Sequence, residues 1–310
     1  MKWIKKGLIY KPEKKYAWML SHAQLPTVDK ISEEILRIYY GTRDNQNRTV
    51  TTYIEVEADN PNNILYIHDK PVLRLGELGC FDDSGAMPSW IINHGGLKYL
   101  YYIGWNACVS VSYRNSIGLA VSDDDGLTFH RLFKGPIVDR TLHEPHFCGA
   151  TCVIIDGNLW HMYYLSCTHW IIEEGKPEPI YHIKYAESSD GIHWDRRGIV
   201  AIDFKSQDEG GITRPCVIRE ADKYLMWYCY RGKRDYRTNP KNSYRIGHAE
   251  STDGIHWNRQ DERVGISISE EGWDSIMITY AHVYIHKGSM HMIYNGNGFG
   301  ETGFGYAIME

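Results

Sequence analysis

The sequence predicts an all-β protein, a β-propeller of five blades, and three observations lead to this fold class. The segment AESTDGIHW at residues 249–257 returns as AESSDGIHW at 186–194, and more loosely as AVSDDDGLTF at 120–129. A second motif, made of a short apolar run, a turn and a run rich in Tyr and Met, recurs in phase with it. The composition holds 13% aromatic residues, including 23 Tyr and 10 Trp, and 29 Gly, while long apolar helical patterns are few.

The spacing of the first motif predicts the size of the repeating unit. Its glycines, Gly126, Gly191 and Gly254, stand 65 (191 − 126) and 63 (254 − 191) residues apart. This repeat is too long for a helical solenoid and suits one four-stranded propeller blade with generous loops. Each copy is typical of a hairpin, because Asp-Gly supplies the positive backbone dihedrals that a tight turn needs.

The second motif predicts the number of blades. Each copy is typical of an inner strand, a hairpin and a second strand. The copies lie at residues 23–42, 88–104, 151–166, 215–230 and 281–296. Five copies give roughly 62 residues per blade, which a four-stranded blade can use in full.

The two ends of the chain predict how the ring closes. Residues 3–10, WIKKGLIY, are similar to WDRRGIVAI at 194–202, which follows a turn motif, and the final GFGYAIME matches the third strand of a blade. We therefore expect the N-terminal strand to complete the fifth blade and close the ring. The alternative is that Trp3 is merely an exposed aromatic residue near a frayed end.

Composition and charge exclude several classes of protein. The net charge of −5 gives no footprint for nucleic acid, and no apolar run is long enough to span a membrane. The N-terminal segment lacks the apolar region of a signal peptide. The seven cysteines are odd in number and scattered, so they indicate small buried side chains in a reducing compartment. We expect a cytoplasmic protein with one domain over residues 1–310, and the sequence leaves its oligomeric state open.

Taken in order, the blades carry different polar loops. Blade one, about residues 16–75, has Arg43, Asp44, Asn47 and Arg48 after its second strand, where they line a cleft or form a surface loop with local salt bridges. The other loops hold these residues: Trp105, Asn106, Tyr113, Arg114 and Asn115 in blade two (about 81–138); Trp170, Glu173 and Glu174 in blade three (from 139); the basic segment 230–251 in blade four (from 206); the glycine-rich segment 295–305 in blade five (from 270).

Acidic residues precede four of the five inner strands. Blade one has none there, only Tyr16, Ala17 and Trp18, with His22 nearer to the strand, whereas the acids of the other blades are Asp82 and Asp83, Glu144, Glu209 and Asp274. Inner strands surround a central channel, so we expect these carboxylates to meet at one mouth of it. Like charges that share a confined site raise one pKa, which suits a general acid beside an ionised partner in glycosidic cleavage. The alternative is that these acids cap turns.

Among the acids, Glu144 is the strongest candidate for a general acid, because LHEPH places it in a stiff loop between two histidines. Asp83 or Asp274 would be its partner, and Trp273 beside Asp274 could stack on a sugar face. His22 and Arg214 lie where an inner strand begins and could bind an anionic or hydroxylated ligand.

His282, within the inner strand of blade five, could bind substrate or a central metal ion, or could be a satisfied core histidine. The sequence contains no HExxH, no EF-hand loop, no P-loop, no dinucleotide fingerprint and no GxSxG motif. We therefore expect no cofactor, with a metal ion at the channel axis as the open alternative.

The SxDGxxW hairpins, the five inner-strand repeats and the acids at blade openings resemble the five-bladed β-propeller glycosidases, which include glycoside hydrolase families 43, 32 and 68 and the family 130 mannoside phosphorylases. The resemblance covers the whole chain, and the RDxxNR segment that begins at Arg43 is most similar to family 130. In families 43 and 32 it implies an Asp of blade one as base or nucleophile, an Asp of blade two as support and a Glu of blade three as acid. Asp83 and Glu144 match the second and third roles by position, but no Asp opens blade one.

For family 130, the resemblance implies that phosphate attacks and that basic residues hold it. The residues that could serve are Arg43, Arg48, Arg114, Arg214 and Arg245. The segment SDDDGLTF at 122–129 matches the Asp-box of sialidases, which is a structural turn remote from catalysis.

We therefore expect a carbohydrate-active enzyme that cleaves a glycosidic bond by hydrolysis or phosphorolysis. Its substrate contacts would be His22, Arg43, Asp44, Trp105, Arg114, Arg214, Trp273 and His282. A catalytically inert propeller that binds a glycan or a nucleotide sugar is the main alternative, and the missing acid of blade one favours it. A sialidase is less favoured, because the count gives five blades and no early Arg-Ile-Pro segment is present.

Overall fold

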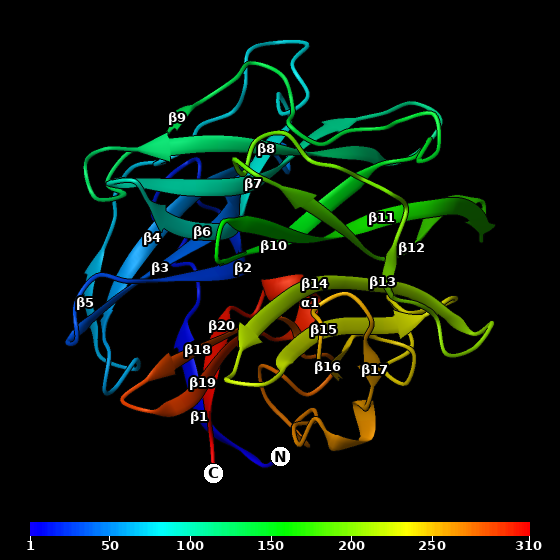
Figure 1. Ribbon diagram of the computed structural model, residues 1–310. Helices are drawn as coiled ribbons and strands as arrows, with labels where there is room; N and C mark the ends of the chain where they lie inside the picture. Colours follow the sequence, from blue (N-terminus) through cyan, green and yellow to red (C-terminus); the bar gives the residue numbers. More distant parts are fainter.

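The computed structural model describes all 310 residues, and the chain is nearly all β, as the sequence predicted (Figure 1). Its strands fall into five groups of four, which we call units one to five. The strands are, in unit one, β2 (Ser21–Lys30), β3 (Ile35–Arg43), β4 (Thr49–Glu57) and β5 (Ile64–Ile67); in unit two, β6 (Gly85–His94), β7 (Leu97–Ala107), β8 (Tyr113–Ser122) and β9 (His130–Arg131); in unit three, β10 (Cys148–Asp156), β11 (Leu159–Glu173), β12 (Lys176–Ser188) and β13 (Val200–Ile202); in unit four, β14 (Glu209–Arg219), β15 (Tyr224–Gly232), β16 (Arg245–Ser251) and β17 (Asn258–Arg259); in unit five, β18 (Thr279–His286), β19 (Ser289–Asn295), β20 (Phe304–Met309) and β1 (Trp3–Tyr10). A 3-10 turn (Asp261–Arg263) follows β17, and the short helix α1 (Asn297–Gly300) follows β19.

Within each unit, neighbouring strands pair antiparallel, and two single parallel pairings join units into larger sheets. Thr49 pairs with Gly85 between units one and two, and Tyr181 pairs with Gly211 between units three and four. The result is two eight-stranded sheets and one four-stranded sheet, none of which closes on itself. The first strands of the units are neighbours in a cyclic order, since β2 contacts β6, β6 contacts β10, β10 contacts β14, β14 contacts β18 and β18 contacts β2. Closure into a five-bladed ring stays a prediction, and this order of contacts supports it.

The N-terminal strand is the fourth strand of the last unit, at the place that the sequence predicted. β1 pairs antiparallel with β20, from Trp3 opposite Met309 to Tyr10 opposite Phe304, and the two chain ends lie side by side (Figure 1). Trp3 is buried and meets Trp227 edge to face, with 6.0 Å between the ring centroids. Its burial rules out the alternative of an exposed residue at a frayed end.

The SxDG turns of units two, three and four each attach their unit to the one before it. In the third unit, the carboxylate of Asp190 accepts hydrogen bonds from two backbone N–H groups of the turn, and Gly191 takes a positive φ of 73°. The carbonyl of Gly191 accepts a hydrogen bond from the Tyr101 hydroxyl of unit two at 2.8 Å. The same contact recurs between Tyr39 and Gly126 at 2.8 Å and between Tyr163 and Gly254 at 2.7 Å. The motif repeats because the same docking contact repeats.

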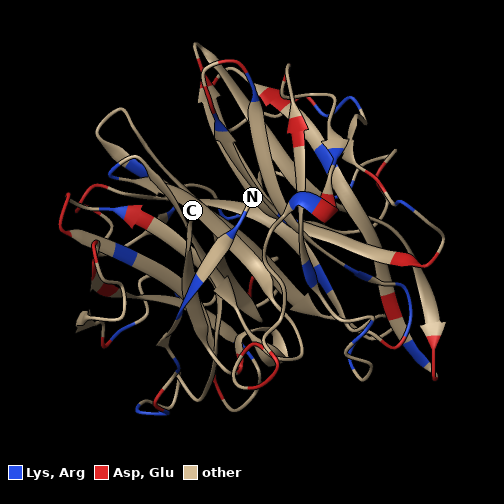
Figure 2. Cartoon of the chain, turned by 90° about the horizontal axis from the view of Figure 1, so that it is seen from below, with Lys and Arg blue, Asp and Glu red and all other residues tan.

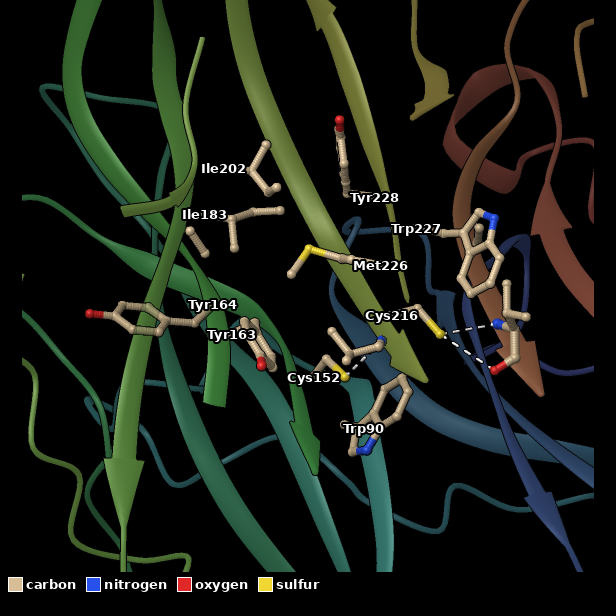
Figure 3. Close-up of a cluster of buried hydrophobic side chains, with 14 of the residues drawn as sticks. Trp90, Cys152, Tyr163, Tyr164, Ile183, Ile202, Cys216, Met226, Trp227 and Tyr228 are labelled. Carbon is tan, nitrogen blue, oxygen red and sulfur yellow. Dashed lines mark hydrogen bonds between the residues drawn. The ribbon is translucent and has the colours of Figure 1, made fainter. Parts of the chain in front are cut away.

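Side chains also join the first strands of adjacent units at their centres. The Ser89 hydroxyl accepts a hydrogen bond from the backbone N–H of Thr151 at 2.7 Å. The sulfurs of Cys152 and Cys216 accept weaker ones from the next first strand, from Val217 at 3.3 Å and from Val283 at 3.1 Å (Figure 3). All seven cysteines are free, and these two are small buried groups, as the sequence predicted.

The apolar core runs between the sheets, and Figure 3 shows part of it around Trp90, Met226 and Trp227. Lys, Arg, Asp and Glu lie on the loops and also along several strands (Figure 2). No helix in the structure has the length and apolar character needed to cross a membrane.

Candidate functional site

All five units contribute to one central pocket of about 480 Å³, a size within the range of about 300–1,000 Å³ that is common for small-molecule sites. Each first strand places at least one residue in its lining. These residues are Gln24 and Leu25 on β2, Met87 on β6, Ala150 on β10, Thr213 on β14 and Tyr280 on β18. Each of these strands has a register shift near the pocket, which turns side chains out of the regular alternation and toward it.

Eight of the 21 residues that line the pocket are aromatic. Phe147 and Tyr113 lie 5.5 Å apart by ring centroids, and Tyr244 and Phe299 lie 5.9 Å apart, edge to face. The other aromatic residues of the lining are Trp105, Tyr181, Tyr236 and Tyr280. Rings of this kind offer flat apolar faces with hydroxyl groups at their edges, which suits a ligand that has both C–H faces and hydroxyls.

Trp105 reaches the pocket because its neighbour on β6 is a glycine. A Cβ atom at Gly85 would lie 1.8 Å from Nε1 of the Trp105 indole, so any side chain there would displace the ring. Trp105 was one of the substrate contacts predicted from the sequence, and it lines the pocket.

An extended hairpin and a loop of unit four hold one wall in place. β11 and β12 are 15 and 13 residues long, so their hairpin extends beyond those of the other units. Near its tip the buried carboxylate of Glu178 accepts hydrogen bonds from the Tyr236 hydroxyl and from Nε and Nη2 of Arg237, the latter two at 2.9 and 3.2 Å. Burial alone would raise the pKa of Glu178, but these donors lower it below its usual value.

Several residues of the site were not singled out from the sequence, among them Gln24, Tyr181 and Tyr280 in the lining and Glu178 behind it. The neighbours of Glu178, Tyr236 and Arg237, line the pocket, whereas Glu178 stands behind them. The available signal for Glu178 was an acid between two prolines, KPEPI, in the excursion that faces the basic segment 230–251. The acids singled out in this excursion were instead Glu173 and Glu174, of which Glu173 accepts a hydrogen bond from the backbone of Asp235 at 2.7 Å.

Arg43 supplies a guanidinium to the pocket without a counter-ion. Its Nε donates to the Gln24 side chain at 2.9 Å, and no carboxylate lies within ion-pair distance of it. Burial lowers the pKa of Arg43, and the positive charge of Arg237 lowers it further. Burial and the charge of Arg43 also lower the pKa of the adjacent His22 to about 4, so this imidazole is neutral near pH 7.

No carboxylate lines the pocket, and the predicted cluster of acids is not found. Glu144 is buried in unit three, where its two oxygens accept hydrogen bonds from Tyr164, at 3.0 and 3.2 Å, and one also accepts from Ser166 at 2.7 Å. Nitrogens of Lys184 and Arg196 lie 3.7 Å from the same carboxylate. Glu144 thus binds side chains of its own unit and does not line the pocket.

The same arrangement recurs in the other units that carry an acid. Asp82 accepts from Tyr102 at 3.0 Å and pairs with Arg131 at 2.7 Å, and Asp274 accepts from Tyr294 at 3.0 Å and pairs with Lys5 at 2.6 Å. In unit four, Arg259 pairs with Glu209 at 2.8 Å and with Asp261 at 2.7 Å, and Tyr228 donates to Asp261. We call each set of tyrosine, acid and cation a carboxylate tie. In units two, three and five the tie joins the segment before the first strand to the second strand. In unit four the acid that the tyrosine binds is Asp261, after the last strand, and Arg259 links it to Glu209. The cation lies on the outermost strand in units two, four and five.

Asp83, rather than Asp82, was the predicted partner of Glu144, and the structure gives it a turn-capping position. Its carboxylate accepts from the backbone of Gly79 at 3.0 Å, from the Ser84 hydroxyl at 2.9 Å and from the Asn106 amide at 2.7 Å. These hydrogen bonds lower the pKa of Asp83, although its partial burial opposes them. Glu144, Asp83 and Asp274 share no hydrogen bond with one another, so the capping alternative describes Asp83 and the carboxylate tie describes the other two.

Arg214 and His282 lie at the axis but beneath the pocket. Arg214 is fully buried and donates to the backbone carbonyls of Ser89 and Pro26 and to the Thr27 hydroxyl, so its contacts are all with the protein. His282 stacks on Trp90, with 4.7 Å between centroids, and burial together with the charge of Arg214 lowers its pKa well below the usual value. A cation as neighbour argues against a metal ion at His282, and the chain has no group of three His, Cys, Asp or Glu side chains arranged to hold one.

The remaining predicted contacts divide between the pocket and its surroundings. Arg43 and Trp105 line the pocket, together with Asn47, Tyr113 and Asn115 from the same polar loops. The other four lie outside the lining: Asp44 pairs with Arg48 at 2.8 Å in a local turn, Trp273 stacks on Tyr294 at 5.1 Å, His22 lies beside Arg43, and Arg114 lies on β8.

Comparisons with known proteins give relatives of unestablished activity and solved structures of similar fold. No protein-family model matches the chain. Two uncharacterized proteins of Mycobacterium tuberculosis, MT1551 of strain CDC 1551 and Rv1502 of strain H37Rv, are each 39% identical over 310 residues, which is 100% of this chain and of theirs.

Among solved structures, that of a BT0996–RGII complex superposes with a TM-score of 0.71 at 17% identity, covering 98% of this chain and 90% of that one. The family 32 β-fructofuranosidase of Bombyx mori superposes with a TM-score of 0.66 at 13% identity, covering 98% of this chain and 61% of that one. These neighbours confirm the resemblance to the five-bladed propeller glycosidases at the level of the fold.

Proposed function

The chain belongs to the family of the mycobacterial proteins MT1551 and Rv1502, and from its fold and its pocket we propose that it is a carbohydrate-active protein of the glycosidase type. In this proposal the five units are the blades of a closed propeller, and the central pocket is the sugar site. One observation carries it: all five units contribute to a pocket with aromatic walls and hydrogen-bonding amides and hydroxyls. That lining fits the apolar faces and the hydroxyl groups of a sugar ring.

Glycosidic cleavage in this pocket would involve Glu178 rather than Glu144. Two carboxyl groups usually flank the scissile bond, one as acid and the other as base or nucleophile. Glu178 is a carboxylate in direct contact with the lining side chains Tyr236 and Arg237, and its lowered pKa keeps it ionised near pH 7. It therefore suits the role of a charge stabiliser that acts through Tyr236 and Arg237, while the proton donor would come from a hydroxyl of the wall.

Binding without cleavage is the second candidate, because no carboxylate lines the pocket. The acids that the glycosidase resemblance placed at the mouth are held in carboxylate ties or in a turn. A sugar-binding propeller needs no acid and base pair. It needs an aromatic wall and a polar lining, and the pocket of this chain has both.

A panel of aryl glycosides, assayed with and without phosphate, separates these candidates. We expect Glu178→Gln to reduce any turnover by about a hundredfold, which is the usual scale for one charge-stabilising or acid–base group. The matched variant Glu144→Gln should keep the turnover of its folded fraction. Retained turnover in Glu178→Gln and lost turnover in a folded Glu144→Gln would return the chemistry to Glu144. Sugar binding without turnover on any substrate would establish the binding candidate, and the absence of sugar binding would refute the proposal.

A further inference from the structure

The pocket contains two arginines in different electrostatic situations. Arg237 has a counter-ion, since Glu178 accepts two of its hydrogen bonds at 2.9 and 3.2 Å. Arg43 has none, and its only side-chain partner is the neutral amide of Gln24. Glu301 acts on Arg43 from a distance, but its side chain is exposed and forms no ion pair with it. The lining therefore carries one positive charge in excess.

The free part of Arg43 is its terminal edge. Nε is engaged by Gln24 at 2.9 Å, whereas Nη1 and Nη2 have no hydrogen-bond partner in the protein. These two nitrogens form a planar fork that matches two oxygens of one carboxylate or phosphate group. Gln24 is buried and fixes the guanidinium from behind, so the fork is oriented before a ligand arrives.

The excess charge is local to the pocket. The chain as a whole has a net charge of −5, and the neighbouring His22 is neutral near pH 7 because burial and Arg43 lower its pKa to about 4. A confined positive site in a negative molecule attracts an anion selectively, because low-dielectric walls concentrate its field.

We infer that the ligand of this pocket is an acidic sugar, whose oxyanion is bound by Nη1 and Nη2 of Arg43 while its ring lies against the aromatic wall. The inference rests on the proposed sugar-binding function and adds the substrate class. An uncharged sugar would leave the Arg43 guanidinium desolvated and unpaired, which costs binding free energy that an oxyanion recovers. The oxyanion is either the carboxylate of a uronic acid or the phosphate of a sugar phosphate, which share this chemistry.

Calorimetric titration of the intact protein with matched probes tests the inference. The probes are D-galactose with D-galacturonic acid, D-glucose with D-glucuronic acid, D-glucose 6-phosphate, and inorganic phosphate alone. We expect at least one acidic sugar to bind tenfold or more tightly than its neutral partner, with a preference that weakens as NaCl is raised. Uronic acids identify the anion as a carboxylate, and glucose 6-phosphate identifies it as a phosphate ester.

Variants assign the preference to Arg43. Arg43→Gln should abolish the preference for the acidic sugar, and Arg43→Lys should retain a part of it, because the charge remains without the fork. Arg234→Gln is the matched control, since Arg234 is an exposed residue outside the lining and should leave the preference intact. Melting temperatures establish that each variant is folded.

Three results would overturn the inference without refuting the proposed function. The first is equal binding of neutral and acidic sugars, at a site that Tyr280→Ala weakens, and the second is an acidic preference that survives Arg43→Gln. Binding of inorganic phosphate in preference to every acidic sugar would also overturn it, because the anion would then be a separate co-substrate. If no sugar of either kind binds, the proposed function fails together with the inference.

Discussion

The second strands of the units contribute to the carboxylate ties and to the central pocket, but only their residues in the ties repeat from unit to unit. In units two to five a tyrosine of the second strand, Tyr102, Tyr164, Tyr228 or Tyr294, binds an acid and lies near a cation. Three residues further along the chain, equivalent positions hold Trp105, Cys167, Arg231 and Asn297, which have no chemistry in common. Of these four residues only Trp105 lines the pocket, so the ties that stabilise each unit repeat, whereas the residues that each unit gives to the pocket differ.

Unit one sharpens this comparison, because it lacks the tie. Its tyrosine, Tyr40, donates to the sulfur of Met19 at 3.4 Å and lies 3.2 Å from the Tyr10 hydroxyl, with no acid present. The absence of an acid before the first inner strand is visible in the sequence, where the glycosidase resemblance associated it with a lost catalytic group. In the structure it corresponds to a missing tie. Three residues after Tyr40, the same unit supplies Arg43 to the pocket.

Breaking a tie should produce the largest loss of stability. Glu144→Ala removes a buried acceptor from Tyr164 and Ser166 and leaves Arg196 without its nearest carboxylate. We expect the free energy of unfolding to fall by about 3–5 kcal/mol, the usual cost of breaking a buried charged pair. Guanidinium denaturation followed by tryptophan fluorescence measures it.

The control is Glu77→Ala, which removes an exposed pair with Lys134 and should cost less than about 1 kcal/mol. A cost for Glu144→Ala as small as that of the control would contradict the structural role of the tie. A folded Glu144→Ala protein that loses all turnover with normal stability would place the residue in the chemistry instead.

The sequence predicted the framework better than the site, and the reason is physical. The repeats encode hairpins and docking turns that depend on local chemistry, such as Ser188 and Asp190 in one short segment, so five groups of strands and the place of β1 could be read from them. The acids before the inner strands repeat as well, and their repetition was taken for catalysis. Which way a side chain such as Glu144 points depends on its partners across the sheet, and no spacing in the sequence reveals it.

Glycine substitution in a docking turn should have the next largest effect. Gly191→Ala forces a side chain into a positive φ of 73° and places its Cβ 2.7 Å from the Trp160 ring. We expect a loss of about 2–3 kcal/mol from backbone strain and steric overlap together. Gly198→Ala is the matched control, because its φ is 78° but nothing lies within 4 Å of the added Cβ.

The difference between Gly191→Ala and Gly198→Ala in thermal unfolding separates the steric overlap, with Trp160 of the same unit and Tyr101 of unit two, from the backbone strain. Equal losses in the two variants would mean that this overlap costs no stability. The expected loss for Gly198→Ala is about 1 kcal/mol, which is strain alone.

Acidification should lower the stability of the folded protein through His22, which lies beside the pocket residue Arg43. Burial and Arg43 lower its pKa from 6.5 to about 4 in the folded protein, so between these values the unfolded chain binds the additional proton. Stability therefore falls as the pH drops from 6.5 toward 4, by about 1–2 kcal/mol at pH 5 from this residue. His22→Gln should reduce the difference in melting temperature between pH 7.5 and pH 5 by a few degrees. An unchanged difference in this variant would show that His22 takes up its proton normally in the folded state.

Removing one docking hydrogen bond should have the smallest effect. Tyr101→Phe leaves the ring in the core but deletes the donor to the Gly191 carbonyl at 2.8 Å. We expect a loss of about 1–2 kcal/mol, because a buried acceptor is left unpaired, with no change in sugar binding. In the double variant Tyr101→Phe with Gly191→Ala, the two losses should sum to less than their separate values, since both act on one contact between units two and three. Strict additivity would mean that the hydrogen bond and the turn conformation stabilise the chain independently, and the docking turn would then not be a single structural unit.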